Sequence, residues 1–246
     1  MPSTQSSVTG NRLLALLPRK HRDGFVAECE QVDLVFGDVI SEEGDRIEHV
    51  YFPTGNSFIS LMTRVEGSPN LEVGMVGNEG MSGISVMLNN NVSPLRTLVQ
   101  GSGTAIRMKT ATFARALKNR PPLVRVLNRY LYVLMSQLAQ TAACTRFHIV
   151  EGRLARWLLM TQDRAHADRF ELTQEFVAKM LGVRRVGVTA SAGGLQRLGL
   201  IKYRRGELHV LDRAGLEAVA CSCYAADQLL FTRIMGARRA QLPSAV

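Results

Sequence analysis

The sequence has few cysteines, no long hydrophobic run and no basic segment followed by an apolar one at its start. Each absence excludes a class of protein. Four cysteines in 246 residues are too few for a scaffold held by disulfides. No apolar run approaches the roughly 20 residues of a membrane-spanning helix. The first ten residues are polar and lack the order of a secretory signal. We therefore expect a cytoplasmic protein.

The motifs of common enzyme classes are also missing. The sequence contains neither a Walker A motif nor a dinucleotide-binding fingerprint. A hydrolase nucleophile elbow needs the spacing G-x-S-x-G, which Gly80-Met-Ser82-Gly83 does not have. We therefore expect a protein that is not an enzyme.

Positive charge is in excess, and most of the excess lies in the C-terminal part. Residues 1–145 contain 14 Lys and Arg against 12 Asp and Glu, whereas residues 146–246 contain 16 against 9. Such an asymmetry favours a polyanionic partner for the C-terminal part. A basic solvated surface is the alternative interpretation.

Turn residues divide residues 31–108 into short apolar stretches. Val32–Phe36 is followed by Gly37-Asp38, and Leu71–Val76 is followed by Gly77-Asn78. Short strands with this spacing predict an antiparallel β sandwich or barrel. The strand-like pattern ends at Lys109. Thr110 is then a candidate N-cap for a short helix through Lys118. The expected fold class is α+β.

Residues 121–146 predict one long helix. Pro121 and Pro122 suit a helix start, and no Gly or Pro follows as far as Thr145. Apolar side chains recur at a spacing of 4, 3 and 4 residues, at Leu127, Leu131, Leu134 and Leu138. This spacing is typical of the seam between paired helices, so we interpret these leucines as a dimer interface. Packing of the helix on its own β domain is the alternative.

Residues 172–201 carry the strongest signal. Thr173 is a candidate N-cap of one helix, and Gly182 ends that helix and permits the tight turn of a helix-turn-helix. A second helix begins near Arg184 and presents Arg184 and Arg185 together. One guanidinium can bind guanine O6 and N7, and the other can neutralise a phosphate. The sequence therefore predicts a recognition helix near residues 184–198.

A basic hairpin follows, with a turn at Arg205-Gly206, and is typical of a wing that contacts phosphates. The glycines at 193 and 194 each lower helix propensity by about 1 kcal/mol relative to Ala, so we expect the second helix to be weak or curved near its end. The candidate DNA-binding residues are Thr173, Gln174, Arg184, Arg185, Val186, Thr189, Lys202, Arg204 and Arg205.

These segments resemble the winged helix-turn-helix of the Crp–Fnr superfamily of bacterial transcription regulators. The resemblance is carried by Leu172-Thr-Gln-Glu-Phe-Val-Ala178, Leu181-Gly-Val-Arg-Arg185 and Leu195-x-x-Leu-Gly-Leu-Ile201. Upstream, Gly77-Asn-Glu-Gly80, the proline-flanked helix and Glu151-Gly-Arg-Leu-Ala155 follow in the family's order. The resemblance covers roughly residues 13–226.

The resemblance implies a cyclic-nucleotide-binding-like β jelly roll over residues 1–120 and a dimerisation helix over 121–146. It implies a winged helix-turn-helix domain over 147–226, followed by a C-terminal tail over 227–246 that we expect to be mobile from Gly236. It also implies a homodimer on a two-fold site in double-stranded DNA, with RNA polymerase and a small-molecule effector as further partners.

Candidate effector-binding residues are Glu79 and Arg96. In the family's cyclic-AMP binders Gly-Glu is followed by Arg-Ser at a fixed spacing, but here the loop after Glu79 is longer and Arg96 falls about one position away. Leu138 and Ala139 stand where those binders place hydroxyls. These differences argue against cyclic AMP. An ordinary turn carboxylate is the alternative role for Glu79.

No metal site is expected. An Fnr-type iron–sulfur centre needs a cluster of N-terminal cysteines, and Cys29 is the only one in that region. Cys221-Ser-Cys223 is not a C-x-x-C pair and lacks a second pair, so we interpret Cys221 and Cys223 as buried or inert thiols. His49, His148, His166 and His209 lack the ligand spacing H-x-x-x-H. The sequence leaves haem open.

Loss of DNA binding is the alternative function. Val186 and Ala190 stand where the family's cyclic-AMP activator has a glutamate and a second arginine, so the second helix has fewer polar groups to contact bases. The protein would then be a ligand-sensing or scaffold module.

Overall fold

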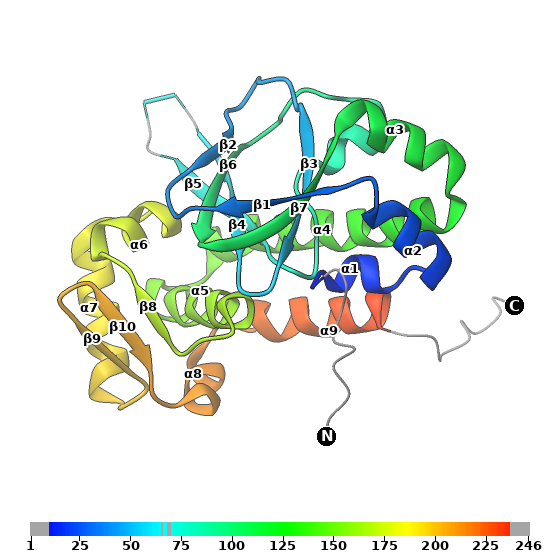
Figure 1. Cartoon of the computed structure of the whole chain (residues 1–246). Helices are drawn as coiled ribbons and strands as arrows, with labels where there is room; N and C mark the ends of the chain where they lie inside the picture. Colours follow the sequence, from blue (N-terminus) through cyan, green and yellow to red (C-terminus); the bar gives the residue numbers. More distant parts are fainter. Residues whose placement is uncertain (1–9, 65, 68–69, 237–246) are drawn as a thin grey trace, which may run out of the picture.

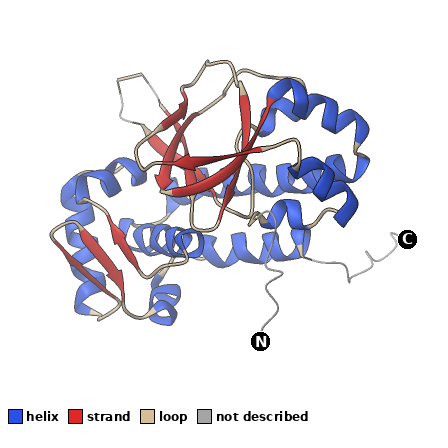
Figure 2. Cartoon of the chain, in the orientation of Figure 1, coloured by secondary structure: helices blue, strands red, loops and turns tan. Residues whose placement is uncertain are grey.

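The computed structural model describes residues 10–64, 66–67 and 70–236. Figure 1 shows a β domain above a long helix, with a smaller C-terminal domain at one end of that helix. The colouring in Figure 2 confirms an α+β protein, because the strands gather in these two domains and helices surround both. Within the described residues, no helix combines the length and apolarity needed to cross a bilayer.

The β domain contains two antiparallel sheets, as the strand pattern predicted. One sheet has the order β1 (Glu30–Leu34), β7 (Gly103–Lys109), β3 (His49–Thr54). The other has the order β2 (Val39–Ser41), β6 (Arg96–Gly101), β4 (Phe58–Thr63), β5 (Leu71–Val76). Alternating side chains point between the sheets, so Ala105 from one sheet packs with Ile59 and Val99 from the other.

Short helices close the β domain. The helices α1 (Arg12–Ala15) and α2 (Arg19–Val26) precede the sheets and were not predicted, because neither is long enough to show a clear period. Phe25 of α2 is fully buried and stacks edge-on against Phe52, with ring centroids 5.4 Å apart. The 3-10 helix η1 (Ile84–Leu88) and α3 (Thr110–Asn119) complete the domain.

The predicted cap at Thr110 is wrong. Thr110 is already the first residue of α3, whose N-cap is Lys109, and no side chain caps this helix. The hydroxyl of Thr110 instead donates a hydrogen bond of 2.6 Å to the carbonyl of Ile47. The threonine therefore joins α3 to the loop before β3.

The long helix α4 (Pro121–Phe147) forms as predicted, but its leucines do not all face outward. The side chains of Leu127 and Leu134 are 0% and 6% exposed, respectively, and both pack in the core of their own β domain. Leu131 and Leu138 are half-buried. The assignment of Leu127 and Leu134 to a dimer seam is therefore corrected, because a seam residue must be accessible to the partner.

The C-terminal domain surrounds one apolar core. It comprises α5 (Val150–Ala165), α6 (Gln174–Leu181), α7 (Arg185–Arg197) and α8 (Arg213–Val219). Its sheet has the order β8 (Arg169–Glu171), β10 (Glu207–Val210), β9 (Ile201–Arg204). Leu158 of α5, Val177 of α6 and Val188 of α7 meet in this core, which holds the two helices of the helix-turn-helix against α5.

The last helix corrects the predicted tail. Residues 227–235 belong to α9 (Cys223–Met235), which returns from the C-terminal domain and packs along α4 (Figure 1). Its Asp227 is buried and accepts a 2.8 Å hydrogen bond from Arg156 Nη2, and Met235 reaches the core of the β domain. A buried ion pair and an apolar anchor hold this segment in place. The residues beyond Gly236, predicted to be mobile, lie outside the described chain.

Strand β5 attaches the C-terminal domain to the β domain. The Glu72 carboxylate is buried there and accepts hydrogen bonds from Trp157 Nε1 of α5 at 2.8 Å and from Ser60 Oγ at 2.6 Å. Burial raises the pKa of Glu72 from 4.5 to about 7, and its two hydrogen bonds oppose this shift. Nearby, Arg164 Nη2 of α5 lies 2.8 Å from Glu79 Oε1. The two domains are therefore joined by polar contacts as well as apolar ones.

The raised pKa of Glu72 predicts that stability depends on pH. Between pH values of about 4.5 and about 7, the folded protein retains a proton on Glu72 that the unfolded chain has released, so stability falls as pH rises through this window and then levels off. Glu72→Gln removes this titration but can keep both hydrogen bonds. We expect the stability of the wild type relative to Glu72→Gln to fall over this window, as measured by urea unfolding. A constant difference between the two proteins would contradict the prediction.

Candidate nucleic-acid interface and ligand pocket

The first helix of the helix-turn-helix has the predicted ends. Thr173 Oγ1 accepts a 3.1 Å hydrogen bond from the backbone N–H of Phe176, which confirms Thr173 as the N-cap of α6. Gly182 follows α6 with φ of +62°, a left-handed conformation that suits glycine. Leu71 of β5 lies against this turn, so that a Cβ added at Gly182 would lie 2.7 Å from Leu71 Cδ1. The turn is therefore fixed by its backbone and by the β domain.

The second helix divides into a buried face and an exposed face. Its buried side chains pack against α5 and α6, and they are the predicted ones: Val188, Ser191, Ala192 and Leu195. Arg185 begins the helix and Arg184 is its N-cap, and both are exposed together with Val186 and Thr189. The paired guanidinium groups are therefore accessible at the leading end of α7, where a base-reading helix needs them.

A side-chain contact links the exposed ends of the two helices. Thr189 Oγ1 lies 2.6 Å from Gln174 Oε1, to which it can donate a hydrogen bond. This bond engages the carbonyl oxygen of the Gln174 amide and leaves its two N–H donors for another partner. Gln174 and Thr189 thus form a connected polar edge beside Arg185.

The two glycines do not interrupt α7. The helix continues through Gly193 and Gly194 to Arg197, so the expected weakness near residue 193 does not end it. A Cβ added at Gly194 would collide with the carboxylate of Glu151 on α5. Gly194 therefore allows close approach of α5 to α7, a reason that depends on a contact distant in sequence.

The wing is a three-stranded sheet rather than a hairpin alone. Arg205 and Gly206 both have positive φ, +53° and +83°, as a two-residue hairpin turn requires. Strand β10 pairs with β9 and also with β8, so that Arg169, His209 and Lys202 lie in one row across the sheet. These three side chains share the outer face with Arg204, while Phe170, Leu208 and Ile201 are buried.

Arg169 is a candidate contact that sequence reasoning missed. It lines a surface groove together with Lys202, Arg204, Arg205, Glu207 and His209. Strand β8 has only three residues, so no alternating pattern could identify it. The register of β8 against β10 places a fourth basic side chain beside the predicted ones.

A tyrosine holds the wing against the helix-turn-helix. Tyr203 of β9 donates a 2.6 Å hydrogen bond from its hydroxyl to the carbonyl of Leu172, just before α6. Burial raises the pKa of Tyr203 to about 12, so the hydroxyl stays protonated and able to donate at neutral pH. The basic face of the wing is thereby held in a constant position relative to α6.

The β domain contains a cavity of about 340 Å³ between its sheets and helix α4. Most of its lining is apolar, including Leu131, Leu134 and Leu138 from α4. Serine and threonine hydroxyls also line it, and Ser85 Oγ is buried with no hydrogen-bond partner among the described residues. The cavity is therefore suited to a largely apolar ligand with one or a few polar groups.

The two predicted effector residues do not meet in this cavity. Glu79 forms an ion pair with Arg164 and accepts a 3.2 Å hydrogen bond from the backbone N–H of Gly77. Arg96 lies 3.2 Å from Glu42 Oε1. Neither residue is among the described side chains that line this cavity, although Glu79 lines a separate cavity beside α5 and α9. Their role in effector binding stays a prediction. Glu79 serves as a turn carboxylate that also joins the two domains.

Comparison with known proteins agrees with this geometry. Residues 152–219 match the family model of the Crp-like helix-turn-helix domain. This segment is a Crp-like helix-turn-helix domain. For this segment, the resemblance to the helix-turn-helix of the Crp–Fnr superfamily is thereby confirmed. No curated protein matches the sequence.

Several solved structures share the fold along most of the chain. FixK2 from Bradyrhizobium japonicum is similar with a TM-score of 0.66 at 13% identity, over 78% of this chain and 98% of that one. CLP, the c-di-GMP responsive global regulator of Xanthomonas campestris, has a TM-score of 0.65 at 13% identity, over 78% of this chain and 99% of that one. A putative transcriptional regulator of the Crp/Fnr family from Eubacterium rectale has a TM-score of 0.65 at 15% identity, over 84% of this chain and 96% of that one. At these identities the likeness establishes the fold.

The left-handed turn at Gly182 predicts a selective loss of stability. Gly182→Ala would place a Cβ in a conformation that costs about 1–2 kcal/mol and against Leu71, so we expect a lower melting temperature. Gly187→Ala is the matched control, because Gly187 lies within α7 with open space around its Cβ position and there Ala is favoured by about 1 kcal/mol. If thermal unfolding shows that both substitutions lower the melting temperature equally, the role of the turn is refuted.

Proposed function

We propose that this protein is a homodimeric transcription regulator that binds a two-fold site in double-stranded DNA. The observation that carries the proposal is the leading end of α7, where Arg184 and Arg185 are exposed while the opposite face of the helix is buried. The basic outer face of the wing lies on the same domain and supplies side chains for backbone phosphates. We infer that the protein acts in the cytoplasm, with RNA polymerase as a further partner.

Helix α4 offers the surface for the homodimer. Its exposed apolar side chains recur along one side, at Tyr132, Met135, Ala139, Ala142, Ala143 and Phe147. A spacing of three and four residues aligns these side chains as one stripe, which pairs well with a second copy of itself. In this proposal the stripe takes the place of the buried Leu127 and Leu134 of the predicted seam. In such a dimer the two recognition helices need to lie about 34 Å apart to enter successive major grooves.

The cavity beside α4 is the proposed effector site, and its lining argues against cyclic AMP. A cyclic phosphate needs a cation or several N–H donors inside the site. Arg96 is held outside by Glu42, and the lining cation Arg46 is itself paired with Glu48 at 3.5 Å. Leu138 lines the cavity, whereas Ala139 is exposed and does not. Calorimetric binding of cyclic AMP would contradict this inference.

A module that senses a ligand or acts as a scaffold, and that has lost DNA binding, is the second candidate. The exposed face of α7 supports it, since Val186 is 71% exposed and Ala190 is also exposed, and neither side chain can hydrogen-bond to a base. Salt titration separates the two candidates. DNA binding weakens steeply with salt because neutralised phosphates release counterions, whereas a scaffold would show no such dependence.

The exposed Arg185 leads to a prediction about DNA affinity and base preference. Arg185→Ala would remove a bidentate donor to guanine, so we expect binding to weaken by about 1–3 kcal/mol and discrimination to relax at one base position. Lys202→Ala would remove a phosphate contact and weaken binding to all sequences, with a smaller salt dependence. The measurement is a gel shift and footprint on the DNA upstream of the protein's own gene.

Arg19→Ala is the control for loss of charge, because Arg19 is exposed on α2, away from the DNA-binding domain. We expect it to bind DNA as the wild type does. Sequence-specific binding by the proposed mechanism fails if Arg185→Ala and Arg19→Ala behave alike.

The exposed stripe of α4 predicts the oligomeric state. Met135→Glu would place a charge in the centre of a helix pair, so we expect a dimer in the wild type and a monomer in the variant by sedimentation velocity. Leu198→Glu is the matched control, since Leu198 follows α7 and is as exposed as Met135, 60% against 61%. A monomeric wild type, or dissociation by both variants, would contradict the assignment.

A further inference from the structure

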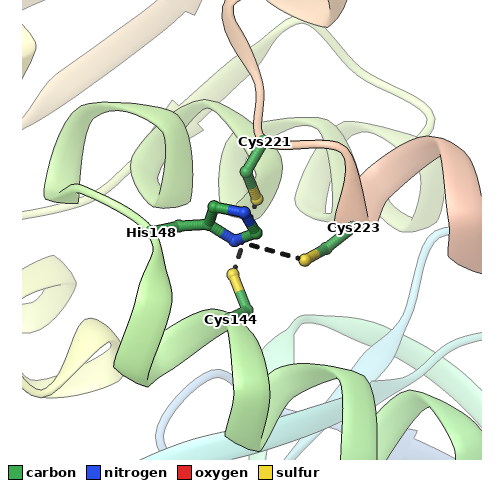
Figure 3. A group of neighbouring side chains, drawn as sticks. All are labelled: Cys144, His148, Cys221 and Cys223. Atoms are coloured by element: carbon green, nitrogen blue, oxygen red, sulfur yellow. Dashed lines mark hydrogen bonds between the residues drawn. The ribbon is translucent and has the colours of Figure 1, made fainter.

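Three of the four cysteines meet a histidine at the junction of the two domains. Figure 3 shows Cys144 and His148 from the end of α4 and Cys221 and Cys223 from the segment that leads into α9, with their side chains pointing into one small space. The four ligand atoms all lie within 4.8 Å of one another. Cys144 Sγ lies 3.5 Å from Cys221 Sγ, and Cys223 Sγ lies 3.4 Å from His148 Nδ1.

These separations match a tetrahedral site for a single metal ion. With bonds of about 2.3 Å to sulfur and about 2.0 Å to nitrogen, neighbouring ligand atoms of a tetrahedral zinc site lie roughly 3.5–3.8 Å apart. A cluster with several irons spreads its thiolates more widely, because they bind different iron atoms. Soft thiolates with one imidazole favour Zn²⁺ over the oxygen-preferring cations. The donor set and its spacing therefore fit one Zn²⁺.

The surroundings favour thiolates in this space. Gln140 Nε2 donates a 2.9 Å hydrogen bond to Cys223 Sγ, as outer partners of metal ligands commonly do. Arg153 and Arg156 of α5 interact electrostatically with Cys144 and Cys221. Three thiolates, one neutral imidazole and one divalent cation carry a net charge of −1. Arg153 offsets this charge, since Arg156 is already paired with Asp227.

The four residues also bracket the DNA-binding domain. Cys144 and His148 come just before α5, and Cys221 and Cys223 come just after α8. The backbone N–H of Cys221 donates a 3.2 Å hydrogen bond to the carbonyl of Gly152, so the entry and the exit of the domain already lie side by side. One ion bound by all four residues would hold residues 149–220 at both ends against α4.

We propose that Cys144, His148, Cys221 and Cys223 bind one Zn²⁺ that fastens the DNA-binding domain to the long helix. Binding exchanges the protons of the three thiols for the metal ion and releases them to solvent, with no change of oxidation state. The ion orders the hinge between α4 and α5, and thereby the direction in which α7 points. This site is independent of the cavity in the β domain.

The test is titration of the full-length, reduced and metal-free protein with Co²⁺ under anaerobic conditions. We expect the visible bands of tetrahedral cobalt and sulfur-to-cobalt charge transfer, saturating at about one ion per chain and abolished by Zn²⁺. Zn²⁺ should also raise the melting temperature, because it binds only the folded chain with all four ligands in place. Octahedral cobalt spectra, or no saturable binding, would overturn the proposal.

Single-thiol variants locate the site. Cys144→Ser and Cys223→Ser should each lower the affinity for Co²⁺ by more than about 100-fold, since changes to outer partners alone cost roughly 10–100-fold. Cys29→Ser is the matched control, because Cys29 lies in the β domain and donates to the carbonyl of Phe25. Equal affinity in all three variants would overturn the assignment. The wild-type titration decides the proposal even if a variant fails to fold.

A disulfide is the competing chemistry for the same thiols. Mass spectrometry after alkylation reports whether Cys144 and Cys221 are linked in protein isolated under anaerobic conditions without added reductant. We expect three alkylated thiols at this site once the metal is removed. A Cys144–Cys221 disulfide there, together with absent metal binding after complete reduction, would reject the metal site in favour of a redox pair.

Discussion

The direction of the recognition helix depends on the buried contact between β5 and the helices of the C-terminal domain. Glu72 would be costly in this apolar position without hydrogen-bond donors, and Trp157 and Ser60 supply both. Leu71 lies against the turn at Gly182, so the same strand also touches the helix-turn-helix. A change in the position of β5 would therefore be transmitted directly to α6 and α7.

Helix α4 connects three functions through three faces. One face completes the core of the β domain, where Leu123 and Leu127 are fully buried. A second face lines the cavity, and Met135 belongs both to this lining and to the exposed apolar stripe. A ligand in the cavity would consequently contact the helix that we propose as the dimer interface. Such a ligand can shift an equilibrium between two packings of α4 only by binding one of them more tightly.

The end of α4 carries the proposed Zn²⁺ site, which complements the contact at β5. The contact at β5 holds the middle of the C-terminal domain through α5 and α6, whereas the thiols and His148 lie where its chain enters and leaves. Two attachments restrict rotation of a domain more than one does. The ion pair between Arg156 and Asp227 also ties α9 to α5.

Local signals in the sequence were sufficient for the helix-turn-helix, the wing turn and the antiparallel sheets. The N-cap at Thr173, the glycine at 182 and the periodic apolar positions of α7 each act over a few residues, so their structural consequences follow from short-range chemistry. The same holds for the exposure of Arg184 and Arg185. These features, and with them the Crp-like helix-turn-helix domain, were determined by the sequence alone.

Contacts between distant segments were decided only by the tertiary structure. An apolar spacing identifies a helix face but not its partner. The spacing therefore predicted a dimer seam for Leu127 and Leu134, although both pack in the core of the β domain. Glu79 and Arg96 each form an ion pair with a different residue, Glu79 with Arg164 and Arg96 with Glu42. These partners also could not be read from a local pattern. Cys144 and His148 are separated by one helical turn, but the other two thiols of their cluster are more than 70 residues away. Their meeting depends on the return of α9 along α4, which no local pattern encodes.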